Sequence, residues 1–213
     1  MKLKFLGKDS GFGDNNNSAY VEIDNTLFLI DCGFSVFNIV KKKFDFSKYK
    51  DIKIIVTHLH NDHAGSLSQV ILYIWNIYHK PVTVISSCEN ISQYLEITGT
   101  MKESYSIENS DECVEFIKTL HVPEIDSYGF LFKFKNEKIL YTGDTCTIEP
   151  FEKYFDDISE LYIDVSTKGG VHLKINEIMP KLLELKAKGI KIILMHLNDK
   201  KAIKKISKNN FII

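Results

Sequence analysis

Residues 57–65 read THLHNDHAG, and this short stretch contains three histidines and one aspartate. Histidine is scarce in the chain, with only seven among 213 residues. A single buried histidine is explained by one hydrogen bond, but a cluster of three is not. Imidazole and carboxylate side chains at short spacing are the usual ligands of a borderline metal ion such as zinc. The stretch therefore predicts a metal site whose remaining ligands lie elsewhere in the chain.

The spacing within this stretch suggests how its side chains are shared between ions. His58 and His60 are two residues apart, so in an extended segment both side chains leave on the same side and can bind one ion. Asp62 and His63 follow after the chain has begun to turn, and they can point to a second ion. We expect Asn61 to make this turn with left-handed backbone angles, which asparagine tolerates.

The hydrophobic pattern around the histidines predicts an α/β fold. IKIIVT (52–57) is an apolar run of strand length, and SLSQVILYIWNIY (66–78) has the spacing of a helix. The turn-prone pair Asp24–Asn25 suggests a hairpin near the N-terminus, and later segments alternate between strands and helices. The two similar halves of this pattern predict helices outside two sheets, in a single domain over residues 1–213.

The same pattern predicts strands and helices along the rest of the chain. The predicted strands are 2–6, 18–23, 26–31, 52–57, 82–86, 113–120, 129–134, 138–144, 160–166 and 190–196. The predicted helices are 34–44, 66–78, 89–97, 175–189 and 199–206.

Further metal-ligating residues stand at the ends of predicted strands. His121 follows FIKTL, Asp144 follows ILYTG, and His196 ends IKIILMH. Strand ends that meet at one edge of a layered α/β fold are where sites are built. Coordination positions left open for water are typical of catalytic sites. The predicted ligands are His58, His60 and His121 for one ion, Asp62, His63 and His196 for the other, and Asp144 as a bridge.

Composition argues against several classes of protein. The net charge of −1 disfavours a protein whose whole surface attracts nucleic acid. No apolar run is long enough for a signal peptide or for a membrane span, so no membrane partner is expected. The cysteines form no CxxC pair, and we expect free thiols in a cytoplasmic protein. They are Cys32, Cys88, Cys113 and Cys146.

These motifs resemble those of the metallo-β-lactamase superfamily. The HxHxDH motif is intact at residues 58–63, and the later ligands of the family follow in order at His121, Asp144 and His196. The resemblance covers essentially the whole chain. It implies a four-layered αββα sandwich and two divalent metal ions, with zinc first and manganese or iron as alternatives. It also implies a homodimer.

Local features favour one branch of this superfamily. The intact His60 is typical of hydrolases, because the redox branch usually departs from the motif at this position. Gly129 and Phe130 follow the third histidine, which is similar to the ribonuclease Z and small phosphodiesterase branch. In that branch an extra histidine, here His172, faces the metals, and an acidic partner, here Asp164, orients it.

The resemblance implies a hydrolase that cleaves a small nucleotide-type phosphodiester. A water that bridges two divalent ions loses a proton near neutral pH and becomes the nucleophile. His172 would protonate the leaving oxygen or contact the phosphate, with Asp164 orienting it. Asp62, His172 and Asp164 are therefore the predicted catalytic residues.

Other substrates remain open at this point. Ribonuclease Z carries an arm that grips tRNA between the third histidine and the bridging aspartate, but only 22 residues separate His121 from Asp144 here. A small-molecule substrate is therefore expected, and nucleic acid is not favoured. The alternatives are a ribonuclease Z-like nuclease, a thioester or lactone hydrolase with the same metals, and a regulatory protein that binds metal without activity.

Overall fold

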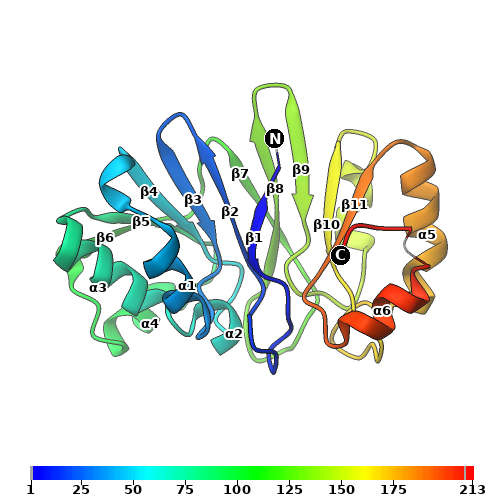
Figure 1. The fold of residues 1–213 in the computed structure, drawn as a ribbon, viewed down its shortest axis with the longest axis horizontal. Coiled ribbons are helices and arrows are strands. Elements are labelled where there is room, and N and C mark those ends of the chain that lie inside the picture. The colour runs from blue at the N-terminus through cyan, green and yellow to red at the C-terminus, as the bar shows by residue number, and fades with distance from the viewer. Residues whose placement is uncertain (1, 209) are drawn as a thin grey trace. The chain divides into compact units, whose positions relative to one another are not determined.

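The computed structural model describes residues 2–208 and 210–213. The chain divides into an N-terminal unit, up to Asp111, and a C-terminal unit, Glu112–Ile213. Each unit contains one sheet and its own helices (Figure 1). The predicted mixture of two sheets with helices is confirmed.

The sheet of the N-terminal unit has the strand order β1-β2-β3-β4-β5-β6. Neighbouring strands are antiparallel from β1 to β3 and parallel from β3 to β6. Strands β3, β4 and β5 are rich in apolar residues because both faces of the sheet are covered there, and Leu29, Ile54 and Val84 are completely buried. The bounds are β1 Lys4–Gly7, β2 Ser18–Ile23, β3 Thr26–Ile30, β4 Asp51–Ile55, β5 Val82–Ile85 and β6 Tyr105–Glu108.

The helices of this unit carry apolar side chains at helical spacing. Helices α1 and α3 contact each other, and Phe37 of α1 packs edge-on against Tyr73 of α3 at a ring distance of 5.6 Å. The helices are α1 Val36–Lys43, α2 Asn61–Ala64, α3 Leu67–Tyr78 and α4 Ile91–Ile97. Two short 3-10 helices are η1 Phe46–Lys48 and η2 Lys102–Ser104.

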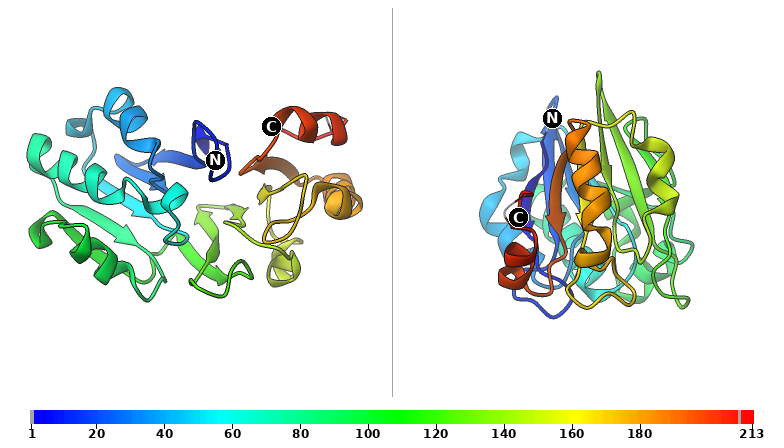
Figure 2. Two further views of the ribbon diagram at one scale, coloured as in Figure 1. Left: turned by 90° about the horizontal axis from the view of Figure 1, so that it is seen from below. Right: turned by 90° about the vertical axis from the view of Figure 1, so that its right-hand side faces the viewer.

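The sheet of the C-terminal unit has the order β11-β10-β9-β8-β7. Strands β7 to β9 are antiparallel, and β9, β10 and β11 are parallel. Helix α5 contacts both β11 and α6, as Figure 2 shows beside the C-terminus. The bounds are β7 Val114–Lys118, β8 Tyr128–Phe134, β9 Glu137–Tyr141, β10 Glu160–Asp164, β11 Lys191–Met195, η3 Glu149–Tyr154, α5 Ile175–Ala187 and α6 Lys200–Ile206.

Every predicted strand and helix has a counterpart within a few residues of its expected bounds. Asp24 and Asn25 both have left-handed backbone angles in the hairpin turn between β2 and β3. The expectation for Asn61 was wrong, because this residue begins the right-handed helix α2 and the chain turns there by helix formation. Strand β6 was not predicted, because its residues alternate between half-buried and exposed and form no apolar run.

No helix in the described part of the chain is both long enough and apolar enough to cross a membrane.

Candidate metal centre

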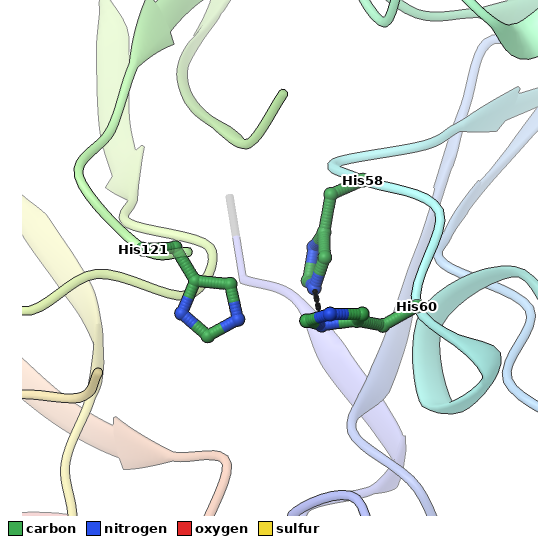
Figure 3. Close-up of side chains that lie close together, drawn as sticks. All are labelled: His58, His60 and His121. Carbon is green, nitrogen blue, oxygen red and sulfur yellow. Dashed lines mark hydrogen bonds between the residues drawn. The ribbon is translucent and has the colours of Figure 1, made fainter. Parts of the chain in front are cut away.

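The loop after β4 presents the first two histidines of the motif. The ring of His58 is buried, and its Nε2 lies 3.1 Å from Nδ1 of His60 (Figure 3). The ring centroids are 4.8 Å apart. His60 has extended backbone angles, so two residues bring both side chains to the same side, as the spacing predicted. Nitrogen atoms this close can contact the same ion.

Helix α2 then turns the chain and presents the second pair. Asp62 lies in the first turn of this helix, and its Oδ2 is 3.3 Å from Nε2 of His63. His63 is completely buried. The motif therefore offers two pairs of ligand atoms from one strand end and one helical turn.

A buried aspartate outside the predicted ligand set holds His63 in place. Asp31 follows β3 with left-handed backbone angles (φ 57°), and its Oδ2 lies 2.9 Å from Nδ1 of His63. The Asp31 carboxylate also accepts hydrogen bonds from the backbone N–H and the hydroxyl of Thr57. The Thr57 hydroxyl in turn lies 3.1 Å from Nδ1 of His58.

This network fixes which nitrogen of each imidazole is available to an ion. A carboxylate on Nδ1 of His63 leaves Nε2 as the ligand atom, and such partners orient metal-binding histidines in proteins. Burial raises the pKa of Asp31, and the charge and hydrogen bond of His63 oppose this rise. The position of Asp31 directly after an apolar strand could have identified it from the sequence. The histidine cluster was a stronger signal, and Asp31 was not predicted.

In the C-terminal unit, three neighbouring parallel strands end beside one another. Asp144 follows β9 after Gly143 (φ 57°), Asp164 is the last residue of β10, and His196 follows β11 (φ 53°). Oδ2 of Asp144 lies 3.4 Å from Nε2 of His196. The carboxyl ends of the parallel strands therefore bring these side chains together, as expected for a site in an α/β sheet.

His121 reaches the same cluster from the loop after β7, and it is the third residue labelled in Figure 3. Its Nε2 lies 3.7 Å from Oδ2 of Asp144. Its Nδ1 lies 3.0 Å from the backbone carbonyl of Val171, which can accept only if this nitrogen carries the proton. This contact leaves Nε2 as the ligand atom, as Asp31 does for His63.

Asp164 and His172 form a hydrogen-bonded pair in this cluster. Oδ2 of Asp164 lies 2.8 Å from Nδ1 of His172, and Oδ1 lies 3.4 Å from Nδ1 of His196. Asp164 also accepts a hydrogen bond from the backbone N–H of Thr145. Burial lowers the pKa of His172, but the hydrogen bond and charge of Asp164, together with the charge of Asp144, outweigh burial and raise it.

The donor set of this cluster fits a divalent metal ion. Ligand atoms of Asp144, Asp164, His172 and His196 lie within 4.8 Å of one another, and three of these four residues are buried. Buried carboxylates are costly unless they are paired or bind a cation. Mixed imidazole and carboxylate ligands are those that zinc, manganese and iron accept. The N-terminal unit thus gathers His58, His60, Asp62 and His63, and the C-terminal unit gathers the remaining predicted site residues.

The chain matches a described protein family along its length. The model of the family described as Anti-Pycsar protein Apyc1 matches residues 1–96 and 82–212. A relative of that name from Bacillus phage 010DV004 is 28% identical, and the match covers 93% of this chain and 90% of the relative.

Solved structures confirm the predicted fold. The metallo-β-lactamase fold protein YhfI from Bacillus subtilis has a TM-score of 0.76 and 18% identity, with coverage of 98% of this chain and 92% of that one. The short form of human tRNase Z has a TM-score of 0.71 and 17% identity, with coverage of 94% of each chain. The chain therefore has the metallo-β-lactamase fold.

Proposed function

The chain belongs to the Anti-Pycsar protein Apyc1 family and is a metal-dependent hydrolase, and from this premise we propose that it is a phosphodiesterase of a small cyclic nucleotide. The relatives' name records an anti-Pycsar activity, and we take the target of that activity to be a cyclic nucleotide. Hydrolysis would add water to phosphorus, break one ring P–O bond and release a linear nucleoside monophosphate. The cytoplasmic location and the homodimer stay predictions.

We propose that the chain holds two divalent ions, with zinc as the expected metal and manganese or iron as alternatives. When bound, such ions lower the pKa of water and stabilise negative charge on a reacting phosphate. Asp31, Thr57 and the Val171 carbonyl support this assignment, because each lies against the Nδ1 of one proposed histidine ligand. The proposed ligands are His58, His60, Asp62, His63, His121, Asp144 and His196.

The observation that carries the phosphodiesterase proposal is the pair formed by His172 and Asp164. Nδ1 of His172 donates to Asp164 over 2.8 Å, so Nε2 is left to give a proton to the leaving oxygen or to contact a phosphate oxygen. The side chain of His172 keeps 22% of its surface exposed, whereas Asp164 is completely buried. Asp164 is therefore a positioning residue that acts through His172.

A small substrate is supported by the segment between His121 and Asp144. Strands β8 and β9 occupy most of this segment, and only Lys135 and Asn136 connect them. Lys135 has left-handed backbone angles in this tight turn. The segment therefore contains a plain hairpin in place of an arm that could grip tRNA.

The proposal is tested with a substrate panel on the metal-loaded protein. The panel contains 3′,5′-cyclic nucleotides, a tRNA precursor with a 3′ trailer, a thioester and a lactone. We expect the highest kcat/KM on a cyclic nucleotide. Preference for the tRNA precursor would assign the chain to the nuclease alternative, and preference for an acyl substrate would assign it to the thioester or lactone alternative. His79→Ala, an exposed histidine at the end of α3, is the control variant.

A further inference from the structure

The loop between β1 and β2 presents one aromatic side chain entirely to solvent. Phe12 has a relative exposure of 107%, and the next most exposed large apolar side chain in the described part of the chain is Ile97 at 78%. Single exposed apolar residues are common on protein surfaces and need no special explanation. The position of Phe12 requires one, because the residues on both sides of it are fixed by close contacts.

Phe12 stands on a turn that is closed by hydrogen bonds. The backbone N–H of Asp9 donates to the carbonyl of Asn15 over 2.9 Å, and the N–H of Asn15 donates to the Asp9 carboxylate over 3.0 Å. The N–H of Gly13 donates to the carbonyl of Ser10 over 2.9 Å. A Cβ atom at Gly13 would lie 2.2 Å from Cβ of Asp9, so only glycine fits there. The conformation of the turn therefore keeps Phe12 exposed.

The residue before Phe12 packs directly against a proposed metal ligand. A Cβ atom at Gly11 would lie 3.2 Å from Oδ2 of Asp62, so the glycine lets the backbone of the loop come close to this carboxylate. The same Oδ2 is 3.3 Å from Nε2 of His63. Phe12 is thus the first side chain that the loop offers to solvent beside these two ligands.

We propose that Phe12 binds the base of the nucleotide substrate by stacking on it, an inference that rests on the function proposed above. In a cyclic nucleotide only the ribose separates the phosphate from the base, so a substrate whose phosphate lies at Asp62 carries its base to the rim of the site. Stacking of bases on aromatic side chains is favourable and tolerates every base, because each has a π face. Phe12 would therefore select nucleotide diesters over diesters without a base.

The test separates the base from the phosphodiester. Phe12→Ala and Phe12→Trp are compared with the parent on a 3′,5′-cyclic nucleotide and on methyl riboside 3′,5′-cyclic phosphate, which lacks the base. We expect Phe12→Ala to raise KM for the nucleotide about 5- to 150-fold, the factor that corresponds to the usual strength of one base stack. We expect Phe12→Trp to retain the parent KM for the nucleotide. The KM for the base-free diester should be nearly the same in the parent and both variants. Ile97→Ala, on α4, is the control for loss of an exposed apolar side chain.

Equal losses on both diesters would overturn the proposal, because Phe12 would then act only through the shape of the loop. An unchanged KM for the nucleotide would overturn it as well. A parent without activity on cyclic nucleotides would instead contradict the proposed function. In that case, binding of a nucleoside monophosphate is followed by fluorescence of Phe12→Trp with Trp75→Phe, which removes the chain's only native tryptophan. Quenching on binding would support base stacking, and binding without a change in fluorescence would overturn it.

Discussion

Single residues at strand ends determine where the site residues point. Asp31 and His196 each follow a strand and adopt left-handed backbone angles, which are unusual for residues other than glycine. The change of direction turns Asp31 toward His63 and places His196 next to Asp144. Such strained positions are maintained where the surrounding structure fixes them, and they concentrate at functional sites.

Replacing Asp31 should weaken metal binding while the ligands themselves remain. Asp31→Asn removes the charge that supports Nδ1 of His63, and loss of such a partner typically lowers metal affinity about 10- to 100-fold. Competition with a chelating dye measures the affinity. Asp45→Asn, at an exposed turn before η1, is the control. Unchanged affinity in Asp31→Asn would show that His63 does not depend on this carboxylate.

Replacing His172 should slow turnover without loss of metal. Because His172 is proposed to supply a proton or a phosphate contact, His172→Ala is expected to lower kcat by about 10²- to 10⁴-fold. Metal content is measured on the same sample and should match that of the parent. Asp164→Asn should also lower kcat, because Asp164 acts through His172. Full activity in His172→Ala would contradict the proposed role.

At the scale of elements, apolar runs predicted the strands, and elements without a clear hydrophobic pattern were not predicted. β4 and β11 were predicted because burial on both faces requires continuous apolar residues. β6 was missed because it is the last strand of its sheet and alternates in burial. α2 was missed because a single turn is too short to show helical spacing.

One carboxylate in the C-terminal unit links β7, β8 and η3, and its effect on stability should depend on pH. Glu115 of β7 pairs with Lys133 of β8, and Tyr154 of η3 donates a hydrogen bond to it over 2.7 Å. The hydrogen bonds from Lys133 and Tyr154 hold the pKa of Glu115 below its ordinary value, against the effect of burial. A lowered pKa stabilises the folded state above the pKa of the unfolded chain, and this contribution is lost as pH falls through the folded pKa.

Glu115→Gln should therefore lower the free energy of unfolding at pH 7, by less than about 1 kcal/mol because the pair is partly exposed. The difference from the parent should shrink at pH 3. Urea unfolding at both values measures it, with the exposed Glu124→Gln as the control. A difference that is as large at pH 3 as at pH 7 would show that packing, and not charge, explains the effect.

At the scale of the whole molecule, the proposed ligands were easier to predict from the sequence than the hydrogen-bond partners that orient them. The proposed ligands could be identified from the sequence because histidine is rare and because each cluster follows an apolar strand. The contacts of Asp31 with His63, and of His121 with Val171, join residues that are far apart in the chain. No local pattern reports such contacts, so they required the structure.

Removal of metal should destabilise the protein. An ion that binds only the folded chain adds about 2.7 kcal/mol at a free concentration one hundred times its Kd. Buried acids such as Asp144 and Asp164 increase the dependence of stability on bound metal, because without a cation they are charges of like sign near one another. Thermal unfolding with and without a chelator should show a lower Tm in the chelator, restored by added zinc. Equal Tm values would contradict metal binding by the folded chain.

We propose that the chain hydrolyses a cyclic nucleotide with metals held around Asp144. The most direct measurement follows a 3′,5′-cyclic nucleotide by phosphorus NMR with the metal-loaded parent and with Asp144→Asn, and determines metal content in both. We predict a linear nucleoside monophosphate from the parent and a rate at least about a thousandfold lower in the variant, because a metal ion contributes several kcal/mol to charge stabilisation. An intact cyclic nucleotide after incubation with the fully metal-loaded parent would contradict the claim.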